Sequence, residues 1–122
     1  MHDLAVERII AVHAAIIARD GGDSRIISEA NLHQLVFRAN LIPDPIPRAA
    51  LLFYTLAAYP AFREGNKRTA QELAEEILAE GGYSLDTADE EPFARLAEGI
   101  AAFTVEPEDI DSYLAAHARK DG

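Results

Sequence analysis

The sequence contains no cysteine and only two lysines, and its 122 residues carry a formal net charge of −10. Without cysteine, disulfide bonds, zinc sites with thiolate ligands and thiol catalysis are all excluded. So acidic a balance argues against a broad nucleic-acid surface, which needs clustered basic side chains to replace phosphate counterions. The basic charge that exists is densest at one place, formed by Arg63, Lys67 and Arg68.

Long apolar runs are also missing. No run approaches the roughly 20 residues that a membrane-spanning helix needs, and the first residues lack the basic and apolar stretches of a secretory signal. The 49% hydrophobic content is enough to bury a core, and no repeat, low-complexity tract or linker divides the chain. We therefore predict a single domain over residues 1–122, soluble and cytoplasmic, with no membrane or nucleic-acid partner.

Hydrophobic periodicity predicts two helices in the first third of the chain. In the first helix, apolar residues recur at helical spacing over residues 4–17, and the helix stops at Gly21-Gly22. Ser28 is a suitable N-cap for the second helix. The predicted inner face of that helix consists of four apolar residues, Leu32, Leu35, Val36 and Phe37.

Prolines divide the middle of the chain. Three prolines in five residues predict that residues 40–47 form a stiff connector and no regular helix. A third helix over residues 48–58 is apolar almost all round, which is typical of a helix at the centre of a bundle. Pro60 ends it, and a loop over residues 59–65 leads into a fourth helix over residues 66–80.

The last third predicts two further helices, over about residues 90–103 and 107–119. The short piece 83–86 between the fourth and fifth helices is predicted to be extended. Because no two runs alternate with period two, strands are at most incidental. The predicted fold class is all-α: a compact bundle of about six helices, with the loop before the fourth helix lying between two central helices.

One segment, Phe-Arg-Glu-Gly-Asn-Lys-Arg-Thr, carries chemistry where the third helix gives way to the fourth. The first N–H groups of a helix have no intrahelical partner, so this position attracts anions. Gly65 allows close backbone approach, and Lys67 and Arg68 are donors suited to phosphate oxygens. Glu64, an acid within the basic cluster, is a natural magnesium ligand. The residues alone leave an alternative, a solvated turn with Asn66 as N-cap.

Residues 61–70 resemble the core motif of the Fic/Doc family: His, any residue, Phe, any residue, Asp or Glu, Gly or Ala, Asn, Gly or Lys, Arg. Eight of the nine motif positions fit, and the lysine and the following Thr-Ala resemble the Doc branch. His13, the Gly21-Gly22 break and the apolar helix before the motif recur in that branch at similar spacing. The resemblance therefore covers most of the chain.

The resemblance implies that the motif loop and the following helix bind ATP with Mg²⁺. Carried over by position, Glu64 would hold magnesium, and Arg68 would stabilise charge on the transferred group. Phosphates would be cradled by Gly65, Asn66 and Lys67. Many family members transfer AMP to a protein hydroxyl, whereas the Doc toxin transfers the terminal phosphate to a translation factor, elongation factor Tu.

The sequence departs from the motif at its catalytic position. The resemblance makes Phe62 the anchor of the loop. Two residues before it, the family has a histidine that accepts the proton of the target hydroxyl, but this chain has Pro60. General-base catalysis contributes about 10²–10⁴ in rate. Tyr59 could approach the site only if the loop register shifted by one residue, and a phenol with a pKa of about 10 is a poor base.

Three explanations of Pro60 stay open: a natural inactive member, a degenerated toxin, or a loss-of-function variant selected because the active form harmed its host. Gln71 stands where many AMP-transferring members have another arginine. Because glutamine lacks that charge, its presence favours transfer of phosphate over transfer of AMP. No segment fits the inhibitory helix of some members, so a separate antitoxin chain would restrain an active ancestor. Elsewhere, His13 is predicted to be a hydrogen-bonded core residue, and His33 and His117 to be surface residues.

The sequence therefore leaves three hypotheses. The first is a Doc-like phosphotransferase or AMP-transferase scaffold that is impaired by Pro60. The second is a catalytically inactive module that binds a nucleotide or an antitoxin. The third is a plain helical interaction domain in which the motif is only a cap and a turn.

Overall fold

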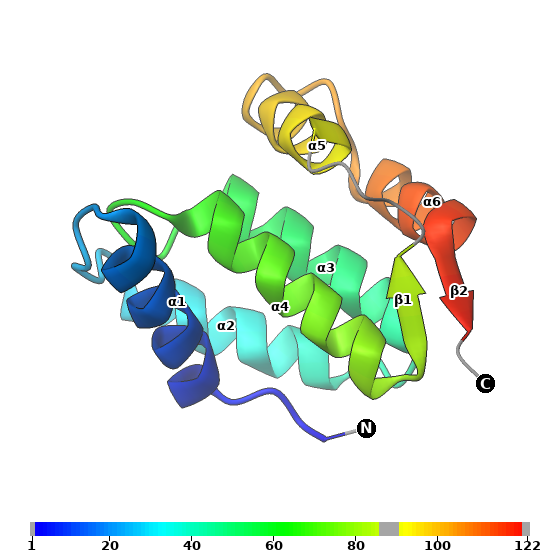
Figure 1. Cartoon of the computed structure of the whole chain (residues 1–122), viewed down its shortest axis with the longest axis horizontal. Helices are drawn as coiled ribbons and strands as arrows, with labels where there is room; N and C mark the ends of the chain where they lie inside the picture. Colours follow the sequence, from blue (N-terminus) through cyan, green and yellow to red (C-terminus); the bar gives the residue numbers. More distant parts are fainter. Residues whose placement is uncertain (1, 86–90, 121–122) are drawn as a thin grey trace.

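The chain folds into helices that pack around one central helix (Figure 1). The computed structural model describes residues 2–85 and 91–120. In this part lie six helices and two short strands: α1 (Val6–Asp20), α2 (Glu29–Asn40), α3 (Pro45–Ala58), α4 (Asn66–Glu80), β1 (Tyr83–Leu85), α5 (Glu91–Ala101), α6 (Pro107–His117) and β2 (Ala118–Lys120). The predicted all-α class is confirmed. Residue 90, where the fifth helix was predicted to begin, lies outside the described residues.

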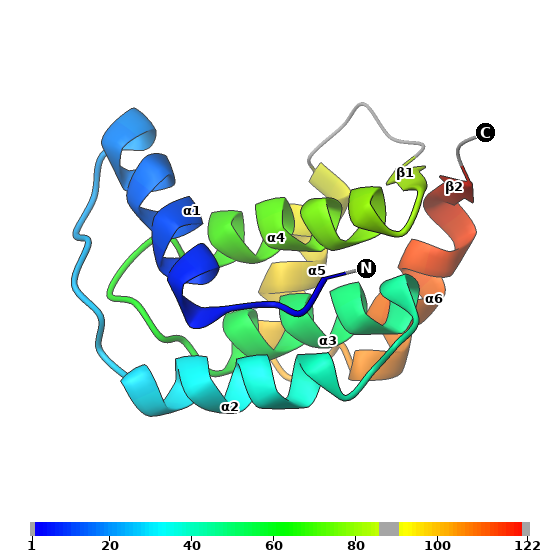
Figure 2. The same ribbon diagram turned by 90° about the horizontal axis from the view of Figure 1, so that it is seen from below.

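The apolar helix α3 occupies the centre, as its sequence predicts. It contacts α2, α4, α5 and α6, and Figures 1 and 2 show it alongside α4, with α1 set at an angle near the beginning of α4. Leu52, Phe53 and Leu56 of α3 and Leu73 and Leu78 of α4 are all buried. Among the described helices, none combines the length and the apolar character that crossing a membrane requires.

The predicted connector over residues 40–47 is partly wrong, because α3 begins at Pro45. Pro45 and Pro47 both lie in the first helical turn, where a backbone N–H has no carbonyl four residues earlier within the helix. A proline therefore loses no hydrogen bond at these positions, and its fixed φ suits the helix. The first helical bond runs from Arg48 N–H to the Asp44 carbonyl, at 3.1 Å.

The predicted inner face of α2 is correct except for Phe37. Ser28 caps the helix as predicted, because its side chain accepts a hydrogen bond from Asn31 N–H at 3.1 Å. Leu32 and Leu35 are buried, but Phe37 is 67% exposed. At 100° per residue, Phe37 lies about 200° around the helix from Leu35, which turns it away from the core.

The predicted sixth helix ends two residues early, at His117, because Ala118–Lys120 pairs with β1 as an antiparallel strand. Tyr83–Leu85 is extended as predicted, and residue 86 lies outside the described residues. His33 is exposed as predicted. His117, also predicted to be a surface residue, is partly exposed, and its ring lies 4.4 Å from the Tyr113 ring, centroid to centroid.

Replacing Phe103 with glycine is expected to stabilise the protein by about 0.5–1 kcal/mol. Phe103 follows α5 with a φ of +60°, in the left-handed region that costs a side chain free energy. Its N–H donates to Ile100 O at 3.1 Å, which closes the helix end. The free energy of unfolding in urea measures the gain. A Phe103→Ala variant is the control, since it removes the 91%-exposed ring and keeps the Cβ; an equal gain there would contradict a backbone cause.

Candidate functional site

The loop between α3 and α4 packs so closely on α1 that position 65 requires glycine. Gly65 is the N-cap of α4 and has a φ of +82°, a conformation that other residues rarely adopt. A Cβ atom at this position would lie 3.2 Å from Ile17 Cδ1 and 3.4 Å from the His13 ring. Gly65 therefore allows the loop to contact α1 and to turn directly into α4.

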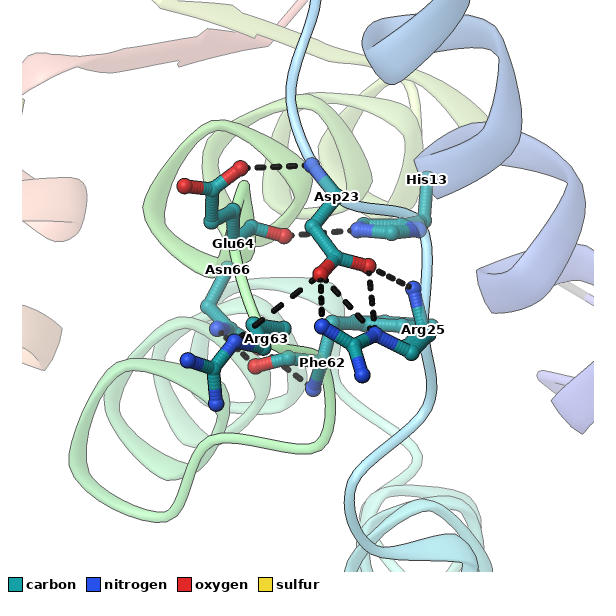
Figure 3. A network of polar contacts seen from close by, with 7 residues as sticks. All are labelled: His13, Asp23, Arg25, Phe62, Arg63, Glu64 and Asn66. Carbon is teal, nitrogen blue, oxygen red and sulfur yellow. Dashed lines mark hydrogen bonds and ion pairs between the residues drawn. The ribbon is translucent and has the colours of Figure 1, made fainter.

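The side chain of Asn66 holds the loop in its conformation (Figure 3). Its Oδ1 accepts hydrogen bonds from the backbone N–H groups of Ala61 and Phe62, at 3.2 and 3.0 Å, and its Nδ2 donates to the Phe62 carbonyl at 2.7 Å. The turn interpretation made Asn66 the N-cap, but that position belongs to Gly65. Because the side-chain amide of Asn66 binds the loop backbone, only the backbone N–H of this residue can donate to an anion.

His13 and Phe62 form a buried stack beneath the loop. Their ring centroids lie 3.6 Å apart with an interplanar angle of 6°, and both residues are at most 2% exposed. His13 Nε2 lies 2.7 Å from the Glu64 carbonyl, and it donates this hydrogen bond because a carbonyl can only accept. The prediction of a hydrogen-bonded core histidine is confirmed. The stack ties the motif loop to the middle of α1.

The connector between α1 and α2, residues 21–28, runs alongside the same loop. Ile27 N–H donates to the Ala61 carbonyl at 2.7 Å, and Arg63 N–H donates to the Arg25 carbonyl at 2.9 Å. A short antiparallel bridge joins residues 26 and 62. The loop is therefore held by α1 on one side and by the connector on another, so its backbone is positioned before any ligand binds.

A cleft of about 560 Å³ opens beside the beginning of α4. Six of the seven residues singled out from the sequence line it: Pro60, Glu64, Gly65, Asn66, Lys67 and Arg68. The seventh, Phe62, is buried in the stack described above. Three basic side chains thus share a concave surface with the first turn of a helix, where backbone N–H groups favour an anion.

Two aspartates that sequence reasoning did not single out contact charged residues of the cleft. Asp23 belongs to the connector: its backbone N–H donates to Glu64 Oε2 at 2.5 Å, and its carboxylate lies 3.8 Å from Arg63 Nε (Figure 3). Hydrogen bonds from Arg25 lower the pKa of Asp23 to about 2. The contact between Asp23 and Glu64 fixes the position of one Glu64 oxygen.

The second aspartate, Asp20, ends α1 and lines the cleft. Its Oδ2 lies 2.9 Å from Arg68 Nη1. Hydrogen bonds from the Arg19 side chain are the largest cause of the lowered pKa of Asp20. Asp20 was missed because its sequence context, the last residue before a glycine pair, marks only a helix end.

Glu64 is the carboxylate that the resemblance assigns to magnesium. It is exposed, and Oε1 has no hydrogen-bond partner among the described residues. Within residues 2–85 and 91–120, no three His, Cys, Asp or Glu side chains form a group that could hold a metal ion. Magnesium is usually bound through one or two carboxylates together with substrate phosphates and waters. Glu64 therefore fits a magnesium ion that arrives with a polyphosphate better than a resident metal.

The cleft offers no histidine to act as a general base in the described part of the chain. Pro60 lines it, and the Pro60 carbonyl accepts a hydrogen bond from Asn31 Nδ2 at 3.1 Å. Tyr59 lies in a separate depression that it shares with Asn31 and Gln34 of α2. The alternative loop register, which would bring Tyr59 to the cleft, is not the one observed.

No family model matches the sequence, and no curated protein matches it.

Proposed function

We propose that this chain is a Doc-like phosphotransferase scaffold that binds ATP with Mg²⁺ at the N-terminus of α4 and is impaired in transfer by Pro60. One observation carries the proposal: Arg63, Lys67 and Arg68 meet the first turn of α4 in a single cleft of about 560 Å³. Small-molecule sites have volumes of roughly 300–1,000 Å³. A polyphosphate matches this concentration of positive charge in an otherwise acidic chain.

In this proposal the residues divide the work of binding and transfer. Backbone N–H groups at Asn66 and Lys67 donate to phosphate oxygens, and Glu64 holds the magnesium ion, which neutralises phosphate charge when bound. A target hydroxyl attacks the terminal phosphorus, the bond to the ADP oxygen breaks, and Arg68 stabilises charge on the transferred group. The hydroxyl proton needs an acceptor, and Pro60 supplies none.

Transfer of the terminal phosphate is favoured over transfer of AMP. Gln71 stands where many AMP-transferring Fic proteins carry an arginine, and its Nε2 lies 3.5 Å from Glu75 Oε1 on the same helix. A neutral amide adds no charge for a second phosphate. The resemblance further implies a translation factor as target and a separate antitoxin chain as partner.

A second candidate is a catalytically inactive module that binds a nucleotide or an antitoxin. The absence of a histidine from the described lining of the cleft favours it. The phosphotransferase and a nucleotide-binding module both require magnesium-dependent ATP binding, whereas an antitoxin-binding module and a plain interaction domain do not. The two candidates differ in whether a restored base produces transfer.

Replacing Arg68 with alanine is expected to weaken ATP binding in the presence of Mg²⁺ about 10- to 100-fold. A hydrogen bond to a charged group contributes about 1.5–3 kcal/mol, which converts to that range of affinity. Isothermal titration calorimetry of the two chains measures the change.

The matched control is Arg38→Ala, which removes the same charge from the exposed face of α2, away from the cleft. Its ATP affinity should equal that of the unmodified chain. Equal affinities in the Arg68→Ala variant and the unmodified chain would sink the site assignment. No ATP binding at all would leave an antitoxin-binding module or the plain interaction domain.

A further inference from the structure

The cleft contains negative as well as positive side chains, and one of the acidic side chains forms an ion pair with one of the basic ones. Asp20 Oδ2 lies 2.9 Å from Arg68 Nη1, and Asp20, Glu64, Lys67 and Arg68 all line the cleft. An anion that binds Arg68 must therefore share it with a carboxylate or displace that carboxylate.

The structure holds Asp20 in place. Arg19 Nε and Nη2 donate to the two Asp20 oxygens at 3.0 and 2.9 Å, and Arg19 Nη1 donates to Glu72 Oε1 at 3.1 Å. The chain of contacts Glu72–Arg19–Asp20–Arg68 joins the end of α1 to the first two turns of α4. The Asp20 side chain is 26% exposed, less than either arginine beside it.

An aspartate is ionised at neutral pH, and the hydrogen bonds from Arg19 lower the pKa of this one further. A bare anion in the cleft would be repelled by Asp20 and by Glu64, and like charges placed together are costly in a binding site. A phosphate ligand that carries a divalent cation does not meet the same repulsion, because its cation offsets the two carboxylates.

We propose that Asp20 is a specificity-determining residue, which makes the cleft select polyphosphates that carry a divalent cation over bare anions. This inference depends on the proposed function, since it concerns the same phosphate site. Arg68 gives the site its affinity for phosphate, and Asp20 sets which form of the phosphate is accepted.

The test compares ATP affinity with Mg²⁺ and with excess EDTA for the unmodified chain and for Asp20→Asn. Removal of Asp20 is expected to tighten Mg²⁺-free binding roughly fivefold or more and to change Mg²⁺–ATP binding much less. The Mg²⁺ dependence of binding therefore falls in the variant. Asp44→Asn is the charge-matched control, because Asp44 is exposed at the start of α3 and its side chain makes no capping bond.

An unchanged ratio of the two affinities in Asp20→Asn would overturn the inference while leaving the proposed function intact. The inference would also be overturned if Asp44→Asn changed the two affinities as Asp20→Asn does, since the net charge of the protein would then be the cause. If none of the three chains binds ATP in either condition, the proposed function itself fails and the inference fails with it. Thermal unfolding of each variant checks that the fold is kept.

Discussion

The Pro60→His variant is expected to transfer label from ATP to protein about 10²–10⁴ times faster than the chain with Pro60. Pro60 lines the same cleft as Glu64 and Arg68, and the proposed site lacks only a proton acceptor. The substitution is compatible with the fold because Pro60 is exposed. The hydrogen bond from Asn31 goes to the residue's carbonyl and does not depend on its side chain.

The measurement is protein labelling in a cell lysate with ATP labelled at either the α or the γ phosphate. Label from the γ phosphate in the histidine variant alone would mark a Doc-like kinase lacking only its base. Label from the α phosphate would mark an AMP-transferring enzyme and contradict the argument from Gln71. Pro60→Ala is the matched control, since it removes the proline ring without adding a base, and it should stay as slow as the unmodified chain.

Transfer of label by all three chains would show that another group serves as the base. Silence from all three, together with intact ATP binding, would leave the inactive binding module as the function of this chain.

Replacing Phe62 with alanine is expected to lower the free energy of unfolding by about 3–5 kcal/mol. Phe62 is 1% exposed and stacks on His13 at 3.6 Å, so its removal leaves a cavity between α1 and the motif loop. Because a domain has about 5–15 kcal/mol of total stability, the variant should be folded but marginal. Chemical denaturation followed by circular dichroism measures the loss.

Phe103→Ala is the control for this prediction, because it deletes the same ring from a position that is 91% exposed. Its stability should change by no more than about 0.5 kcal/mol. A loss below about 1 kcal/mol in Phe62→Ala would show that Phe62 does not hold the loop in the core.

Local sequence signals predicted most of the helices. Helix capping and helical periodicity depend on residues within a few positions of one another. Such local signals include Ser28, the Gly21-Gly22 pair and the apolar character of residues 48–58. The errors arose where a local rule has an exception. Pro45 suits a first turn, and Phe37 was grouped by its hydrophobicity when its angle around the helix turns it outward.

The candidate site divides in the same way. The motif, its position at the start of a helix and the proline at position 60 are contiguous in the sequence, so they can be recognised without a structure. The engagement of Asn66 with the loop backbone was not predicted. Its side-chain amide could bind a ligand, cap the helix or bind the loop backbone, and the path of the loop determines which of these it does.

By itself, then, the sequence determined the all-α class, the acidic surface, the single basic cluster and the lack of a proton acceptor at Pro60. The tertiary structure alone decided that His13 supports the loop from below, that Asp23 contacts Glu64 across 41 positions, and that Asp20 occupies Arg68. The physical reason is that helix formation depends on neighbours within a few residues. Contacts between distant residues depend instead on how α1 packs against α4, which no local pattern specifies.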